Sequence, residues 1–362
     1  MLTGDALSAF KRDNWRRQIK LFPEAINCAE YAIPKRILLE LAGNNLVESR
    51  LVNSNYEVKF GPLTLDGLAE QSMLMLQSLE CHIDAAEELI RQEFSFIPTW
   101  QIDDVMASIG SDGSSCGPHF DRYDVFLLQL AGEKTWRLDK GEHSEADLRD
   151  NTMLRLLEMF EPTMSLSCAP GDVLYVPPGF GHHGISEGES ITLSVGIRNP
   201  TMIELMADIS EFFLLESDLA PLETELKQRG AKVDSRVVLP MIQHVISPRN
   251  LDTWYGCYST RLRNPDVLDS LKTRTGPLDV TAVVDRHVET NIAANLPTRL
   301  AWTEFDQEVI LFVNGDYYLF DSADHSWIVG FCNTRNFKLN PSNNTQLEMT
   351  LELLETGAAR LI

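Results

Sequence analysis

The sequence predicts an α+β protein in which a double-sheet jelly roll of short strands lies between helical segments. Short β-branched and apolar runs, separated by turn residues, fill the stretch from Trp100 to Pro200, as is typical of a jelly roll with an open mouth. Before it, between about residues 35 and 95, apolar side chains recur at helical spacing. Examples are Leu68, Met73, Met75, Leu76 and Leu79. After it, residues 202–215 carry a broad apolar stripe that predicts another helix. This stripe would pack either against the same chain or against a second copy in an oligomer.

Five strands are expected within the barrel stretch. They cover residues 105–109, 125–130, 135–138, 173–176 and 191–197, and a turn at 131–133 separates the second from the third. The last eighty or so residues predict a separate small module. It combines a hairpin of residues 309–313 and 317–320 around Asn314-Gly315 with a helix from Gln346 to Glu355 that Gly357 ends.

Composition restricts the function classes. The chain has 362 residues, of which 44% are hydrophobic, enough for two or three packed domains. A net charge of −22 argues against direct binding of nucleic acid, which needs clustered Lys and Arg. A basic protein partner suits this charge better.

Cysteine usage and hydropathy predict the compartment. The six cysteines are scattered without a CxxC pair, so neither a zinc site nor a disulfide framework is indicated. No apolar run reaches the ~18 residues that a membrane span requires. We therefore expect a soluble cytoplasmic protein without a membrane partner.

One pair of residues predicts a metal site. His119 and Asp121 precede the apolar run 125–130, which we interpret as a strand. Residues two apart on a strand project to the same face, so an imidazole and a carboxylate at this spacing can bind one metal ion from one side. Four of the eight histidines are followed two residues later by Asp or Glu, so the spacing alone is a weak signal.

The other three such pairs are expected to be solvated or capping. His82 lies in an apparent helix, where positions i and i+2 diverge by about 200°. His143 lies in a polar acidic loop, and His287 in an apparent amphipathic helix.

A third ligand is expected from a later strand. Residues 173–176 read as a strand, the following Pro-Pro-Gly turn reverses the chain, and His182 or His183 opens the next segment. Two histidines and one carboxylate on one face of an octahedron form the arrangement of non-haem Fe(II) oxygenases.

Several ordered motifs give this pattern a family resemblance. They are Ile102-Asp103-Asp104-Val105-Met106, Gly117-Pro118-His119-x-Asp121-x-Tyr123-Asp124, Gly132-x-Lys134-x-Trp136, Gly171-Asp172-x-Leu174-Tyr175-x-Pro177-Pro178-Gly179-Phe180-x-His182 and Ser194-Val195-Gly196-x-Arg198. Together they resemble the JmjC-type 2-oxoglutarate oxygenases, and among these the bacterial ribosomal oxygenases, which hydroxylate an arginine of a large-subunit ribosomal protein.

The resemblance implies a domain plan. A double-stranded β-helix (cupin or jelly-roll) catalytic domain with a helical lead-in would cover residues 1–200. A helical dimerisation region would follow at 201–275, and a winged-helix-like C-terminal domain at 276–362. It also implies a homodimer acting on a basic ribosomal protein.

The resemblance also assigns the metal and its cosubstrates. His119, Asp121 and His182 would hold Fe(II), with 2-oxoglutarate and molecular oxygen as cosubstrates. His183 stands where an acidic residue is expected after the third ligand and remains an alternative ligand.

Further site residues follow from the same comparison. Lys134 would pair with the distal carboxylate of 2-oxoglutarate, a dianion that needs a cation at its far end; the alternative is a surface lysine in a hairpin. Asp104, Tyr123 and Ser194 would line the substrate end. A carboxylate there can bind a guanidinium, and Asp103 is the alternative to Asp104.

Two other functions use the same expected barrel. A metal-dependent cupin isomerase would recruit a fourth protein ligand, for which the sequence offers no good candidate. A metal-free acidic scaffold would bind a basic protein through the C-terminal module.

Overall fold

A computed structural model describes residues 2–141, 143–150, 152–215, 246–262, 265–268, 291–340 and 342–362. The chain divides into two compact units, Met1–Asn199 and Pro200–Ile362. The expectations for residues 216–245 and 269–290, which include the helix around His287 and much of the dimerisation region, lie outside the described residues.

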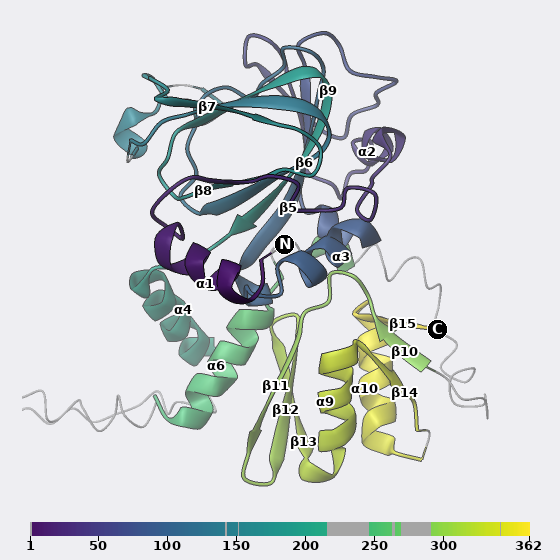
Figure 1. The fold of residues 1–362 in the computed structure, drawn as a ribbon. Coiled ribbons are helices and arrows are strands. Elements are labelled where there is room, and N and C mark those ends of the chain that lie inside the picture. Colours follow the sequence, from purple (N-terminus) through teal and green to yellow (C-terminus); the bar gives the residue numbers. More distant parts are fainter. Residues whose placement is uncertain are drawn as a thin grey trace, which may run out of the picture. The chain divides into compact units, whose positions relative to one another are not determined.

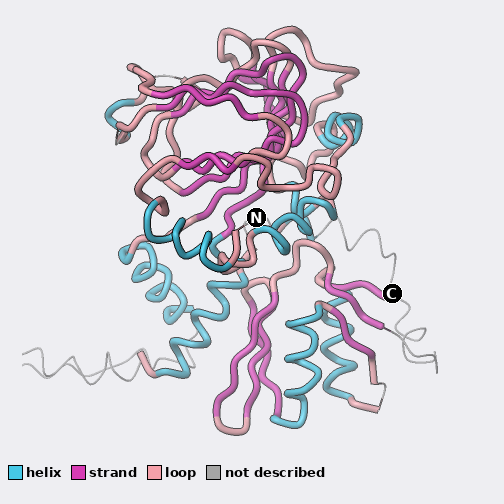
Figure 2. The backbone as a smooth tube through the Cα atoms, viewed as in Figure 1, coloured by secondary structure: helices cyan, strands magenta, loops and turns pink. Residues whose placement is uncertain are grey.

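The first unit is built on a nine-stranded antiparallel sheet that curves into a barrel (Figures 1 and 2). The strands follow the order β1-β8-β6-β9-β5-β4-β2-β3, and β7 pairs with β6. Their bounds are β1 Lys20–Phe22, β2 Ser49–Val52, β3 Val58–Phe60, β4 Met73–Leu76, β5 Ile102–Gly110, β6 Asp124–Leu138, β7 Met164–Cys168, β8 Val173–Val176 and β9 His182–Ile197. This sheet confirms the prediction of a strand-rich barrel domain.

The long strand β6 differs from the prediction of two strands separated by a turn. Residues 131–133 stay within β6, where the register with β9 shifts between Gln129 and Glu133. Gly132 has φ +64°, and a Cβ atom there would lie 1.9 Å from the Glu189 carbonyl oxygen. Glycine therefore allows a bulge in place of a turn. Beyond the bulge β6 exchanges its partner β8 for β7.

A second expectation was wrong: Met73–Leu76 is strand β4, which pairs with β2 and β5, rather than part of a helix. Met73, Leu74 and Leu76 are at most 1% exposed. A short strand that is buried on both faces shows no alternation of apolar and polar residues. Residue spacing alone therefore could not distinguish a strand from a helix here. Similarly, His82 lies in no long helix but caps the 3-10 helix η1 Leu79–Cys81.

Helices and aromatic side chains anchor the N-terminal segment beneath the barrel. The helices are α1 Gly4–Asp13, α2 Lys35–Leu41 and α3 Asp84–Glu93. The Tyr175 ring of β8 stacks on Trp15 at 5.7 Å and meets the Phe10 ring edge-on at 4.9 Å. Its hydroxyl accepts from the Arg16 amide and donates to the Asp124 carboxylate. This contact fixes the start of β6, just after the metal-ligand candidates.

The second unit combines helices with two three-stranded sheets, ordered β14-β10-β15 and β11-β12-β13. The predicted C-terminal hairpin and helix are confirmed. Asn314 and Gly315 take the positive φ values that a tight hairpin turn requires. The bounds are α4 Met202–Leu215, α6 Pro248–Thr260, β10 Asn291–Ala294, β11 Leu300–Phe305, β12 Glu308–Val313, β13 Asp316–Asp321, α9 His325–Thr334, β14 Asn336–Lys338, α10 Asn344–Glu355 and β15 Ala359–Leu361. Among the described residues, we find no helix that is long and apolar enough to cross a membrane.

Candidate metal centre

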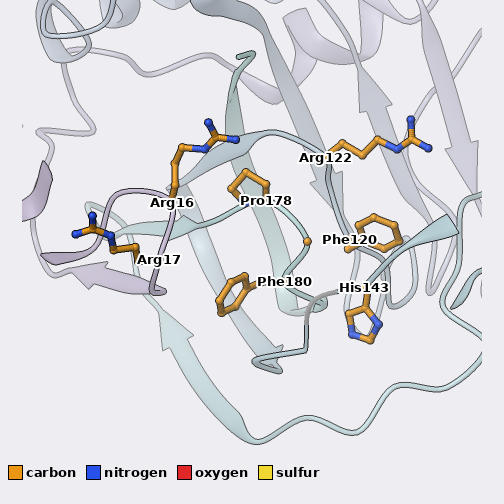
Figure 3. A pocket seen from close by; sticks show the side chains of 8 residues that line it. Arg16, Arg17, Phe120, Arg122, His143, Pro178 and Phe180 are labelled. Carbon is orange, nitrogen blue, oxygen red and sulfur yellow. The ribbon is translucent and has the colours of Figure 1, made fainter. Parts of the chain in front are cut away.

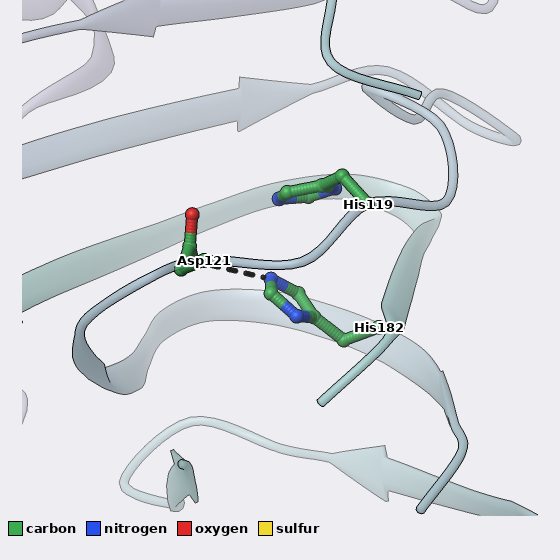
Figure 4. Close-up of side chains that lie close together, drawn as sticks. All are labelled: His119, Asp121 and His182. Atoms are coloured by element: carbon green, nitrogen blue, oxygen red, sulfur yellow. Dashed lines mark ion pairs between the residues drawn. The ribbon is translucent and has the colours of Figure 1, made fainter. Parts of the chain in front are cut away.

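The structure brings His119, Asp121 and His182 together (Figure 4). One ligand atom from each residue lies within 4.8 Å of the others. His182 Nε2 is 3.5 Å from Asp121 Oδ2, and the two imidazole rings lie 4.2 Å apart between their centroids. In the part of the chain that the structure describes, this is the group of His, Cys, Asp and Glu residues that could hold a metal ion.

Backbone pairing aligns the three ligands. The amide of His119 donates to the carbonyl of His182 (3.0 Å), and the amide of His182 donates back (2.8 Å). Gly179 donates its amide to the carbonyl of Asp121 (2.8 Å). His119 and Asp121 were expected on a strand, but β6 begins only at Asp124 and His119 forms an isolated bridge. His119 pairs with His182 through a single backbone bridge, and this pairing does not continue to Asp121 as a strand ladder.

Each histidine directs the same nitrogen toward the centre. His119 Nδ1 lies 2.9 Å from the carbonyl oxygen of Gly117, and His182 Nδ1 lies 3.2 Å from that of Phe180. A carbonyl can only accept, so Nδ1 carries the hydrogen in the neutral ring and Nε2 keeps its lone pair. This arrangement fits a divalent cation held by two imidazoles and one carboxylate.

Burial and neighbouring charges shift the histidine pKa values in opposite directions. Burial, with a smaller contribution from His119, lowers the pKa of His182 to about 4. Burial also lowers the pKa of His119, but the adjacent Cys116 and Asp121 raise it by more, to about 10. Metal binding therefore has to displace a proton from His119. Cys116, whose Sγ lies 4.0 Å from His119 Nδ1, received no role from the sequence.

The neighbouring histidine, His183, is directed elsewhere. It stands opposite Arg137 in the β6–β9 register, and its ring meets Phe160 edge-on at 6.2 Å between centroids. Successive residues of a strand point to opposite faces, which explains why His182 joins the cluster and His183 does not.

Lys134 is buried inside the barrel. Its side chain is 1% exposed, so the alternative of a surface lysine is wrong. Nζ donates to Ser108 Oγ (3.0 Å) and lies 5.3 Å from the centre of the Trp136 ring. The same indole lies 5.9 Å from the His182 ring, so Lys134 and the metal ligands share a neighbour. Burial lowers the pKa of Lys134 to about 8.

The residues expected at the substrate end lie on β5, on β9 and directly before β6. Asp104 and Ser194 are buried, at 6% and 8% exposure. Tyr123 lies against Gly196, where a Cβ atom would come within 3.2 Å of the tyrosine ring and 3.6 Å of the Asp103 Cβ. Asp103, the alternative to Asp104, and Tyr123 therefore both lie next to Gly196.

A cavity of about 560 Å³ is lined in part by residues of the ligand-bearing segments (Figure 3). Phe120 and Arg122, which alternate with the metal-ligand candidates, belong to its lining. The full lining is Arg16, Arg17, Phe120, Arg122, His143, Pro178, Gly179 and Phe180. Three arginines make this cavity unfavourable for a cationic side chain.

Comparison with known proteins identifies the domain. Residues 89–205 match the JmjC domain. A "Probable ribosomal oxygenase" of Haemophilus influenzae is 31% identical over 250 residues, which cover 65% of this chain and 62% of that protein. The "Ribosomal protein uL16 3-hydroxylase" of Escherichia coli is 27% identical over 271 residues, which cover 70% and 71%. The match to the Haemophilus protein thus spans less than two thirds of its length.

A solved structure extends the likeness in fold to the whole chain. The structure of YcfD, a ribosomal oxygenase from E. coli in complex with cobalt and 2-oxoglutarate, covers 100% of this chain and 99% of its own. The TM-score is 0.72 at 22% sequence identity, which shows a shared fold. Residues 89–205 of the chain therefore match a JmjC domain, and the chain is similar in sequence to proteins named as a probable ribosomal oxygenase and as a ribosomal protein uL16 3-hydroxylase.

Proposed function

We propose that this protein is an Fe(II)- and 2-oxoglutarate-dependent oxygenase that hydroxylates an arginine side chain of a large-subunit ribosomal protein. The observation that carries the proposal is the cluster of His119, Asp121 and His182, in which Nε2 of both histidines can bind one ion once His119 has lost its proton. The names of the two bacterial relatives, a ribosomal oxygenase and a uL16 hydroxylase, support the substrate class.

The three ligands leave half of an octahedral shell for cosubstrates. Fe(II), 2-oxoglutarate and dioxygen, when bound there, would supply the insertion of one oxygen atom into a C–H bond, with the other oxygen entering succinate and with carbon dioxide as the leaving product. The chain itself binds and orients. Gly117 and Phe180 hold the imidazoles through their carbonyls, and the Lys134 ammonium would hold the distal carboxylate of 2-oxoglutarate.

The metal-dependent isomerase alternative receives less support. Such a site would recruit a fourth protein ligand, and among the described residues the cluster contains three donors. Lys134 separates the alternatives further, because a cation that is 1% exposed inside the barrel needs an anionic partner. A dicarboxylate cosubstrate provides one.

The substrate's cation is expected to reach the metal from the barrel interior. The cavity beside the ligand-bearing segments is lined by three arginines, whereas Asp104 is a buried carboxylate on β5. A guanidinium bonded to Asp104, or to the alternative Asp103, which lies with Tyr123 against Gly196, suits the barrel interior, with Ser194 nearby. A ribosomal protein substrate would place the reaction in the cytoplasm.

The second unit supports a proposed homodimer. Exposed side chains on α4 are Met202, Ile203, Met206, Leu214 and Leu215, each at least 53% exposed. An apolar helix face of this kind is suited to association with a second copy. We propose that the dimerisation region lies within 201–275 and that 276–362 form the winged-helix-like domain.

The substrate proposal predicts a defined product. Incubation with ribosomal proteins, Fe(II), 2-oxoglutarate and oxygen should add one oxygen atom to an arginine of a large-subunit protein, as measured by peptide mass spectrometry. The addition should require 2-oxoglutarate and disappear with Asp121→Asn. If no arginine gains oxygen while 2-oxoglutarate is decarboxylated, the substrate assignment is wrong.

The pKa of Lys134 predicts how cosubstrate affinity depends on pH. Because burial lowers this pKa to about 8, the ammonium is present below pH 8 and is lost above it. The Kd for 2-oxoglutarate should rise about tenfold between pH 7 and pH 9, since the neutral amine cannot pair with the carboxylate.

The matched variant is Lys134→Arg. Arginine stays charged across this range, so its Kd should be flat over the same interval when measured anaerobically with Fe(II). Parallel profiles for the two proteins would contradict the assigned role of Lys134.

A further inference from the structure

A buried carboxylate outside the metal cluster holds the turn that carries His182. Asp139 directly follows β6 and is 6% exposed. Its Oδ1 accepts from the amide of Gly181 (3.0 Å) and from that of Gly141 (3.1 Å). Its own amide donates to the carbonyl of Gly181 (3.0 Å). Both backbone groups of the residue before His182 are therefore bonded to Asp139.

His143 completes this network on its other side. Its Nε2 lies 2.8 Å from Asp139 Oδ2, and its amide donates to the carbonyl of Gly179 (2.8 Å). Gly179 in turn donates its amide to the carbonyl of Asp121. Asp139 and His143 thus connect the segments that carry two of the three metal-ligand candidates.

The fit between Asp139 and the turn is close. A Cβ atom on Gly181 would lie 2.6 Å from Asp139 Oδ2, so the contact requires glycine at this position. Leu138 stands opposite His182 in the β6–β9 register, which places Asp139 beside the turn through the backbone. The sequence alone suggested only a solvated or capping role for His143.

We propose that Asp139, oriented by His143, is a positioning residue that holds His182 in the place where it binds the metal. The inference rests on the proposed function, since it presumes that His182 is a ligand. A ligand has to be held within about 0.5 Å of its productive position. Partners that orient ligands from outside are worth about 10- to 100-fold in metal affinity.

The test compares Asp139→Ala with Asp139→Asn. The Asn oxygen can still accept from the Gly181 amide, and its NH₂ group can donate to a neutral His143 Nε2. We expect Co(II) affinity, titrated anaerobically by its visible absorption, to fall about 10- to 100-fold in Asp139→Ala and to return close to wild type in Asp139→Asn.

Asp172→Ala is the matched control. The Asp172 carboxylate also accepts two backbone amides, from Glu24 (2.9 Å) and Ala169 (3.0 Å), in the turn before β8. We expect unchanged Co(II) affinity. Equal losses in Asp172→Ala and Asp139→Ala would show a merely structural role and overturn the inference.

A second variant covers the case in which Asp139→Ala does not fold. His143→Phe keeps a ring against Phe120, which lies 6.0 Å from the His143 ring, but removes the bond to Asp139. We expect about 3- to 10-fold weaker Co(II) binding; wild-type affinity would overturn the inference.

A double-mutant cycle tests the contact itself. Gly181→Ala should weaken Co(II) binding in the wild-type background, because its methyl group meets the carboxylate. In the Asp139→Ala background it should add little, because the obstacle is gone. Additive losses would count against direct positioning by Asp139. If the wild-type protein binds no Co(II), the proposed metal site itself falls, and this inference with it.

Discussion

Asp121→Asn should lose nearly all of the proposed hydroxylase activity while remaining folded. The substitution replaces the anionic ligand, 21% exposed at its side chain, with a neutral amide of the same shape. Loss of a direct ligand should cost more than the 10- to 100-fold that outer partners contribute, and we expect about 10³-fold weaker Fe(II) binding. The measurement is metal affinity together with succinate release.

Asp112→Asn provides the control for this result. Asp112 is an exposed carboxylate of the same unit that accepts the Gly188 amide (2.7 Å), a bond that Asn can also form. It should retain wild-type metal affinity and activity. If Asp121→Asn kept more than about a tenth of the activity at saturating Fe(II), Asp121 would not be a ligand.

Lys134→Ala should raise the Kd for 2-oxoglutarate about 100-fold. Removing one partner of a buried charge pair costs about 3 kcal/mol, which corresponds to that factor. Metal affinity should change little, since Nζ contacts Ser108 and Trp136 rather than the metal-ligand candidates. The measurement is an anaerobic titration of the Fe(II) protein with 2-oxoglutarate.

Lys134→Met separates the effect of charge from that of packing. Methionine fills much of the same space without a charge. It should bind 2-oxoglutarate as poorly as the alanine variant, whereas its melting temperature should equal or exceed that of the wild type. Burial lowers the pKa of Lys134, so the charged lysine costs free energy in the folded state. Wild-type affinity in Lys134→Met would refute the ion pair.

The metal cluster could be predicted from the sequence because the residues that indicate it form short local patterns. His119 and Asp121 are two residues apart, and the Pro-Pro-Gly turn before His182 marks where the chain returns. The choice between His182 and His183 needed either the family resemblance or the structure. The β6–β9 register, which assigns the two histidines to opposite faces, depends on pairing between distant segments.

The errors in the fold come from the same limit. Gly132 looked like a turn residue, but its positive φ serves a bulge whose partner, Glu189, lies 57 positions further along the chain. Met73–Leu76 lacked the alternation of a strand because side chains on both faces of β4 are buried. In each case a tertiary contact decided between two locally acceptable structures.

The residues around the ligands were the hardest to predict. Trp136 was part of a motif, but only folding brings its ring beside both Lys134 and His182. Asp139 is 43 residues from His182, and a bond between its carboxylate and the Gly181 amide leaves no trace in local spacing. Such contacts depend on strand register, which one sequence does not reveal.

The central claim is that His119, Asp121 and His182 hold an iron that binds 2-oxoglutarate. It is tested most directly by adding Fe(II) and then 2-oxoglutarate to the protein without oxygen and recording the visible spectrum. We predict a weak charge-transfer band that appears only with both additions, saturates at one equivalent of iron, and is absent from His119→Ala. A spectrum without this band, or an equal band in His119→Ala, would contradict the claim.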